Sequence, residues 1–246
     1  MDNSLRALCD AIKKILVQLK PQKNQLSFVI NAGRNDQGKS ALLKQSSLEE
    51  IPVFGEEQAK IYYNHKGIIV ELGENWIVQS KTLLQNTFKQ LNKCNPYLKI
   101  TGFIFCVDIN TLLRDEVHQF AEERKAHLLL LQRMGVALGY PVELAIIFTK
   151  MDTLAGFAEF YQMDHATDVA KPLGFSLDCI NQIKKKTETY SKQFNHLVEM
   201  QGQQVINKMH PARSTIKRSL IREFPLQLAS LGPPTQALVQ GIQTKL

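Results

Sequence analysis

The chain has 246 residues, 44% of them hydrophobic and 22% charged, which is the usual balance for a globular protein with a full core. It has no apolar run long enough to cross a bilayer, no signal pattern at its start, and four cysteines scattered without metal-binding spacing, so we expect a soluble segment with reduced thiols in a cytosolic setting. The net charge of +7 does not choose between nucleic acid, a membrane surface and an acidic partner.

The first part of the chain predicts a helix, a strand and a phosphate-binding loop in succession. Residues 3–20 carry leucines and isoleucines at helical spacing with lysines opposite, and residues 21–24 break this helix. Residues 26–30 have the pattern of a buried strand, and residues 40–44 that of a helix. Between them, residues 33–40 read Gly-Arg-Asn-Asp-Gln-Gly-Lys-Ser, which fills the pattern G-x-x-x-x-G-K-[ST].

This pattern predicts a loop that wraps a polyphosphate. A tight turn directs successive backbone N–H groups at the phosphates, and Lys39 supplies a positive charge for the terminal phosphates, while the Ser40 hydroxyl is placed to ligate Mg²⁺. The other expected phosphate contacts come from Gly33, Asn35, Asp36, Gln37 and Gly38. A chance match in an ordinary loop is the alternative, and the flanking strand and helix argue against it.

Alternating strand and helix patterns follow the loop. Residues 61–63 and 67–72 predict a hairpin, residues 102–108 and 142–148 predict buried strands, and residues 82–91 and 112–134 predict helices. Such alternation predicts an α/β fold of the P-loop type, a mainly parallel sheet with flanking helices and ligands at the carboxyl ends of its strands.

From residue 178 onward the pattern is helical only. It covers residues 178–209, 212–223 and 226–244, with breaks at Pro211 and at Phe224-Pro225 and an interruption of the last helix at Pro233-Pro234. We therefore divide the chain into an N-terminal amphipathic helix (1–24), a P-loop domain (25–177) and a helical extension (178–246).

A second motif follows the strand over residues 142–148. Thr149-Lys150-Met151-Asp152 fills the pattern T-K-x-D at the place where a P-loop sheet faces the base of a nucleotide. The carboxylate of Asp152 would accept two hydrogen bonds from N1 and N2 of guanine, which adenine does not supply, and the stem of Lys150 would lie along the purine ring. Alone the motif is a weak signal, since a polar turn after a strand has the same composition. Downstream of a phosphate loop it favours GTP over ATP.

Three stretches of the chain have distinctive sequences: residues 101–108 with the following helix, residues 148–160, and Arg222-Glu223-Phe224-Pro225-Leu226-Gln227. Together they resemble the IcmF/TssM family, large inner-membrane proteins of bacterial type VI and type IVB (Dot/Icm) secretion systems. The most specific part is T-K-x-D-x-x-x-G-F-x-E-F over residues 149–160. The resemblance covers residues 25 to 235, and the length of the chain points toward the type IVB member.

This resemblance implies a GTPase-like domain on the cytoplasmic face of the bacterial inner membrane, anchored by segments outside this chain, with a DotU/TssL-type membrane protein as its partner. It implies GTP or GDP with Mg²⁺ as the ligands. Gly33, Gly38, Lys39 and Ser40 then become phosphate and magnesium contacts, and Thr149, Lys150 and Asp152 become base contacts.

Four departures from the family pattern and from GTPases bear on activity. Asp36 stands where the family usually has glycine, and Glu71-Leu72-Gly73 replaces the strand-end D-T-A-G that helps hold Mg²⁺, so that Glu71 becomes the magnesium residue. No threonine occurs between Ser40 and Thr82 to serve as a switch ligand for Mg²⁺. Glu74 stands where many GTPases keep a water-orienting glutamine, which the family also lacks. We therefore expect at most a slow GTPase.

The remaining basic residues do not form one stripe, so we expect no nucleic-acid partner. Arg213 and Lys217 share one side of their helix, and Arg218 and Arg222 lie roughly opposite, which suits a solvated face or contact with anionic lipid headgroups. The leading function is a structural and regulatory component whose nucleotide occupancy biases residues 41–60 and 73–81. The alternatives are a pseudo-GTPase scaffold and a conventional GTP or ATP hydrolase.

Overall fold

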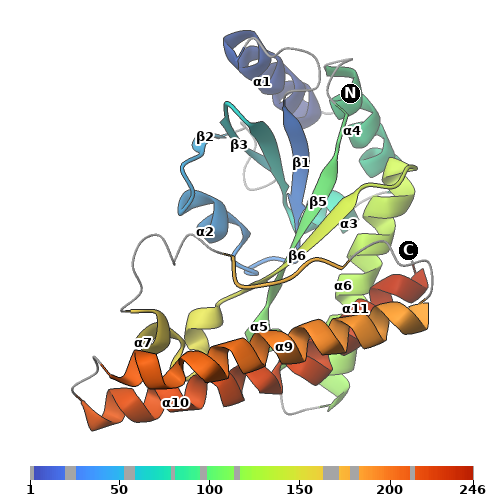
Figure 1. Ribbon diagram of the computed structural model, residues 1–246. Helices are drawn as coiled ribbons and strands as arrows, with labels where there is room; N and C mark the ends of the chain where they lie inside the picture. Colours follow the sequence, from blue (N-terminus) through green and yellow to red (C-terminus); the bar gives the residue numbers. More distant parts are fainter. Residues whose placement is uncertain are drawn as a thin grey trace. The chain divides into compact units, whose positions relative to one another are not determined.

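The computed structural model describes residues 3–19, 26–52, 59–78, 81–94, 99–113, 117–162, 172–177, 183–210 and 214–245 (Figure 1). The chain forms two compact units. The first consists of residues 1–108 and 125–149, and the second of residues 109–124 and 150–246. The domain boundaries expected from the sequence remain a prediction. Among the described helices, none combines the length and the apolar character that crossing a membrane requires.

The first unit is built on a mixed sheet. Its described strands lie in the order β2-β3-β4-β1-β5-β6. Strand β1 pairs in parallel with β4 and β5, β5 pairs in parallel with β6, and the two remaining pairs, β2 with β3 and β3 with β4, are antiparallel. The strands are β1 (Ser27–Ala32), β2 (Glu49–Pro52), β3 (Ala59–Asn64), β4 (Gly67–Leu72), β5 (Gly102–Asp108) and β6 (Glu143–Thr149).

The centre of this sheet is apolar because strands covered on both faces have no solvent-facing side. Phe28 and Ile30 of β1, Val70 of β4, and Phe105 and Val107 of β5 are all buried. Because β1, β4, β5 and β6 run parallel, their carboxyl ends lie at one edge of the sheet.

Helices surround this sheet within the first unit. They are α1 (Asn3–Leu19), α2 (Lys39–Lys44), α3 (Glu74–Val78), α4 (Lys81–Cys94) and residues 125–138 of α6 (Val117–Leu138). Helix α1 buries Leu5, Leu8, Ile12 and Ile15 at the spacing that the sequence predicts, and it contacts α4 and β3. The P-loop order of strand, loop and helix is confirmed by β1 and α2.

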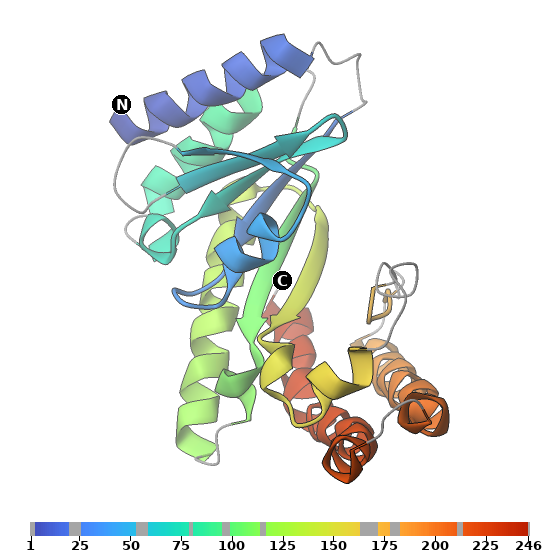
Figure 2. The same ribbon diagram turned by 90° about the vertical axis from the view of Figure 1, so that its left-hand side faces the viewer.

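The second unit is helical. It contains α5 (Ile109–Leu112), the start of α6, the 3₁₀ turn η1 (Met151–Thr153), α7 (Phe157–Tyr161), α9 (Ile183–Met209), α10 (Thr215–Ser230) and α11 (Gly232–Lys245). Helix α9 lies beside both α10 and α11, and α10 contacts α7 (Figures 1 and 2).

The break predicted at Phe224-Pro225 is wrong, because α10 continues through Pro225. A proline inside a helix removes one backbone hydrogen bond, but here Ile221, Phe224 and Leu228 are buried along one face and hold the helix together. The helix ends at Ser230 instead, with Leu231 as its C-cap. Pro233 and Pro234 do not interrupt α11: they lie in its first turn, where the missing N–H would have no partner anyway.

Two further elements differ from the prediction. Strand β2 is not among the strands that the sequence predicts, and it pairs with β3 at the edge of the sheet. The single helix expected over residues 112–134 is two helices, α5 and α6, with Leu113 and residues 114–116 between them, of which 114–116 lie outside the described residues.

Candidate functional site

The loop from Gly33 to Ser40 joins β1 to α2 and has the tight shape that its glycines permit. Gly38 precedes α2 with φ of 73°, a left-handed conformation that costs glycine nothing. A Cβ atom on Gly33 would lie only 2.7 Å from the carbonyl oxygen of Cys106 in β5. Gly33 therefore permits close packing of the loop against β5, and Gly38 permits the sharp turn before α2.

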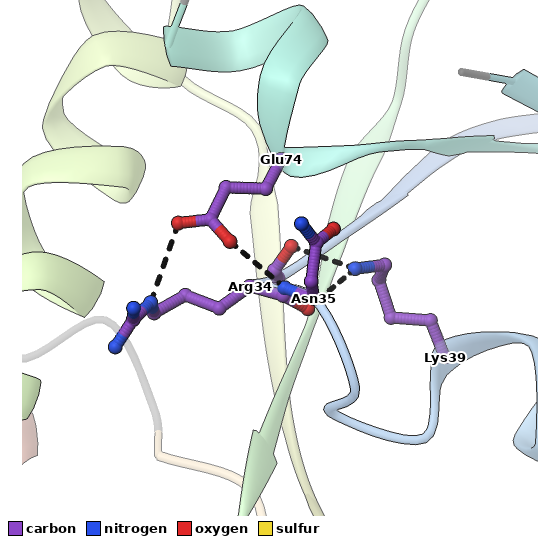
Figure 3. A network of polar contacts seen from close by, with 5 residues as sticks. Arg34, Asn35, Lys39 and Glu74 are labelled. Atoms are coloured by element: carbon purple, nitrogen blue, oxygen red, sulfur yellow. Dashed lines mark hydrogen bonds and ion pairs between the residues drawn. The ribbon is translucent and has the colours of Figure 1, made fainter. Parts of the chain in front are cut away.

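Lys39 is folded back into this loop. It is 7% exposed, and its Nζ donates hydrogen bonds to the carbonyl oxygens of Gly33 at 2.8 Å and Arg34 at 2.6 Å (Figure 3). Burial lowers the pKa of Lys39 below its ordinary value, and the nearby carboxylates of Glu71 and Glu74 act in the opposite direction. A buried ammonium group thus lies inside the loop that the sequence assigns to phosphate.

Residues at the ends of β5 and β6 form hydrogen bonds with Gln37 of the loop. Gln37 is buried, and its Oε1 accepts a hydrogen bond from the backbone N–H of Asp108 at the end of β5. The hydroxyl of Thr149, at the end of β6, donates to the carbonyl oxygen of Gln37 at 2.8 Å. The Gln37 side chain and Thr149 hydroxyl therefore position the loop, a role that sequence reasoning missed. Their predicted contacts with phosphate and base remain predictions.

Asn35 and Asp36 form the exposed tip of the loop. Asp36 has φ of 59°, which is a strained conformation for a residue other than glycine. The backbone N–H of Asn35 donates to Glu74 Oε2 at 2.9 Å, and Arg34 Nε donates to Glu74 Oε1 at 3.3 Å (Figure 3). Glu74 is the first residue of α3, which follows β4. Its carboxylate therefore holds the tip of the loop by accepting these two hydrogen bonds at the start of α3.

Ser40 and Glu71, the two residues predicted to hold Mg²⁺, lie together. The Ser40 hydroxyl donates to Glu71 Oε1 at 2.6 Å. Glu71 is 7% exposed, and its other carboxylate oxygen is buried without a hydrogen-bond partner among the described residues. The two residues that the sequence assigns to Mg²⁺ are therefore in direct contact.

A third side chain, which the sequence analysis missed, completes this group. Lys60 in β3 donates from Nζ to Ser40 Oγ at 3.3 Å, and it lies opposite Glu71 in the antiparallel β3–β4 pair. Tyr62 follows on the same face of β3, and burial, together with Glu71, raises its pKa to about 12, so it is a neutral phenol. The predicted hairpin was the one sequence signal for this contact. It was not enough, because placing residue 60 opposite residue 71 requires the exact strand register.

The Lys60 ammonium group argues against a divalent cation at this place. At phosphate sites Mg²⁺ needs only one or two protein oxygens beside phosphates and waters, which Ser40 and Glu71 would supply. However, Lys60 already contacts the Ser40 hydroxyl that the motif assigns to the metal. No group of three or more His, Cys, Asp or Glu side chains suited to a metal occurs in the described part of the chain. The sequence also lacks a threonine between Ser40 and Thr82 that could add a ligand.

The other predicted base contacts belong to the second unit. Lys150 is exposed and adopts φ of 57°, and Asp152 is exposed within η1. The Thr153 hydroxyl donates to the carbonyl oxygen of Lys150 at 2.8 Å and so fixes this turn. Base recognition by Lys150 and Asp152 remains a prediction.

The rest of the T-K-x-D-x-x-x-G-F-x-E-F signature has a packing role within the second unit. Phe157 and Phe160 of α7 contact Phe224 of α10, with ring centroids 5.6 Å and 4.9 Å apart. Gly156 has φ of 82°, and a Cβ atom there would lie 1.9 Å from the carbonyl oxygen of Leu220. The signature glycine and aromatics thus lock α7 onto α10.

The strand, loop and helix order, the backbone of residues 33–40 and the buried Lys39 define the first unit as a P-loop α/β domain. Residues 78–245 match the family model described as the IcmF-related N-terminal domain. The chain belongs to the IcmF-related family. The matched residues include Thr149, Lys150 and Asp152, and the phosphate loop lies before them.

One similar solved structure is the ADP-ribosylation-factor-like GTP-binding protein, or small COPII coat GTPase SAR1, of Encephalitozoon cuniculi in complex with GDP. Its sequence is 10% identical, the similarity covers 92% of this chain and 91% of that chain, and the TM-score is 0.38. Among curated proteins, none matches this chain. The fold assignment rests on the geometry of β1, the loop and α2.

Proposed function

We propose that this chain is a nucleotide-binding, GTPase-like domain that takes GDP or GTP in the loop from Gly33 to Ser40. The observation that carries the proposal is the buried ammonium group of Lys39, held by the carbonyl oxygens of Gly33 and Arg34. Burying a charge is costly unless it is paired, and the two carbonyl oxygens supply only partial negative charge, so a phosphate group is the partner that would neutralise the ammonium group. The loop around it has the backbone conformation that the phosphate motif requires.

Guanine is the base that we propose. The support is the T-K-x-D motif, in which the exposed carboxylate of Asp152 is available to the two N–H donors of guanine. A comparison of GDP with ADP as ligands tests this choice directly, because an adenine nucleotide supplies no such pair of donors.

Hydrolysis by this site is slow at most. Glu74, which stands where many GTPases have a water-orienting glutamine, is bound to Arg34 and Asn35. The sequence has no threonine in residues 41–81 to sense a γ-phosphate. The carboxylate of Glu71 is hydrogen-bonded to Ser40.

We further propose that the domain belongs to the type IVB member of the family and lies on the cytoplasmic face of the bacterial inner membrane, attached by segments outside this chain. There it regulates assembly of the secretion apparatus with a DotU/TssL-type partner. The support is the family membership together with the resemblance over residues 149–160.

The test uses Lys39→Ala in the full-length protein and measures co-purification of the DotU/TssL-type partner with GDP, with GTP and without nucleotide. If nucleotide occupancy regulates assembly, the variant will lose the nucleotide dependence of co-purification. A pseudo-GTPase scaffold, favoured by the attachment of Glu74 to the tip of the loop, would assemble equally well with either residue at position 39. Phosphate release at ordinary enzyme rates by the isolated protein would instead favour a hydrolase.

A further inference from the structure

We propose that the Lys60 ammonium group takes the place of Mg²⁺, so that this site binds nucleotide phosphates without a divalent cation. The inference rests on the proposed nucleotide binding and specifies its chemistry. It follows from the contact between Lys60 Nζ and Ser40 Oγ, the atom that the phosphate motif assigns to the metal.

The β3–β4 hairpin fixes where Lys60 lies. Antiparallel pairing sets Lys60 directly opposite Glu71, and residues opposite each other project from the same face of a sheet. Glu71 in turn accepts the hydrogen bond from Ser40. The strand register therefore places a cation beside the hydroxyl of Ser40, the second residue of α2.

The Ser40 hydroxyl is engaged on both sides. It donates its proton to Glu71 at 2.6 Å and accepts from Lys60 at 3.3 Å. A Mg²⁺ ion bound to Ser40 Oγ at about 2.1 Å would then lie no more than about 5.4 Å from the Lys60 nitrogen, given the 3.3 Å contact. Two like charges at that range repel each other, and the repulsion is strong in a partly buried site.

Lys60 is the cation best placed for this task. Lys39 donates within the loop, to the carbonyl oxygens of Gly33 and Arg34, where the proposed function places the phosphates, and Arg34 pairs with Glu74. Glu71 retains a buried carboxylate oxygen without a hydrogen-bond partner among the described residues, and such a group favours a cation nearby. A lysine ammonium is a compact point charge that also binds phosphate oxygens.

The experiment is a calorimetric titration of GDP and GTP into the unmodified protein, once in EDTA and once in millimolar MgCl₂. The variants are Lys60→Met, which keeps the apolar stem and removes the charge, and Lys60→Arg, which keeps the charge. Lys66→Met in the exposed turn of the same hairpin is the matched control. Thermal unfolding of each variant monitors the fold.

We expect the unmodified protein and Lys66→Met to bind GDP equally well in both buffers. Lys60→Met should lose about 10- to 100-fold in affinity in EDTA, the usual effect of removing a charged hydrogen-bond donor, and regain part of it with Mg²⁺. Lys60→Arg should remain independent of Mg²⁺.

A requirement for Mg²⁺ in the unmodified protein, or full affinity of Lys60→Met in EDTA, would overturn the inference and leave the proposed nucleotide binding standing. Absence of binding in both buffers is a different pattern, and it would overturn the proposed function together with the inference.

Discussion

The carboxylate of Glu74 accepts a hydrogen bond from the backbone N–H of Asn35 at 2.9 Å, across 39 positions of sequence. Asn35 lies at the tip of the phosphate loop, where backbone N–H groups are expected to point at an anion. The Glu74 carboxylate therefore occupies a backbone N–H donor that a bound phosphate would otherwise use. Arg34 holds the same carboxylate at 3.3 Å.

Glu74→Gln should strengthen nucleotide binding, because it removes a negative charge that competes for the loop. Arg34 and Glu74 are partly exposed, with 31% and 21% of their side-chain surface accessible, so the pair is screened by solvent. We expect a gain of about 1 kcal/mol, or about fivefold in Kd, measured by titration with GDP. Glu143→Gln at the opposite end of the sheet is the control and should change nothing. A weaker affinity in Glu74→Gln would mean that this carboxylate supports the bound state.

Asp36 has two separable effects, one of backbone and one of charge. Asp36→Gly should relieve the left-handed conformation, at φ of 59°, and stabilise the protein by about 1 kcal/mol. Asp36→Asn should tighten nucleotide binding through loss of charge while leaving stability unchanged, since asparagine tolerates this backbone equally well. Thermal unfolding and GDP titration of both variants separate the effects. Equal stability of Asp36→Gly and the unmodified protein would contradict the proposed strain.

Gly156 should tolerate no side chain. A Cβ atom would lie 1.9 Å from the Leu220 carbonyl oxygen at a φ of 82°, so Gly156→Ala must move α7 away from α10. We expect a loss of more than about 2 kcal/mol in the free energy of unfolding. Gly202→Ala is the control. It lies in α9 with nothing within 4 Å of its Cβ position, and it should stabilise by about 1 kcal/mol. Equal stability of the two variants in chemical denaturation would refute the close packing of α7 on α10.

Cys106 should resist alkylation in the folded protein. Its side chain is fully buried, and burial raises the pKa of its thiol to about 12. Because the thiolate is the reactive form, raising the pH from 7 to 9 activates an ordinary thiol but leaves Cys106 protonated. Iodoacetamide labelling at pH 7 and pH 9, located by peptide mass spectrometry, should modify Cys106 only after unfolding in guanidinium chloride. Labelling of the folded protein at the unfolded rate would show that Cys106 is accessible.

Much of the first unit could be predicted from the sequence because its signals are local. The glycine spacing of residues 33–40 determines a loop shape, and the apolar runs around Phe28 and Phe105 determine buried strands. Ser40 and Glu71 could be brought together because Ser40 comes just after the loop that follows β1, and Glu71 lies at the carboxyl end of the parallel neighbour β4.

The remaining features depend on contacts that no local pattern encodes. Lys60 reaches Ser40 only through the register of β3 on β4, and a shift of one residue would turn it to the other face. Pro225 is a helix breaker by propensity, yet burial of Phe224 and Leu228 keeps α10 intact. Local rules for proline were outweighed there by tertiary packing.

The most direct measurement is a calorimetric titration of GDP into the unmodified protein and into Lys39→Ala, both verified as folded by circular dichroism. Phosphate recognition by the loop from Gly33 to Ser40 predicts one GDP bound per chain in the unmodified protein. It also predicts no detectable heat of binding in Lys39→Ala. Failure of the unmodified protein to bind GDP or GTP at millimolar ligand, or equal binding by the two proteins, would contradict the account.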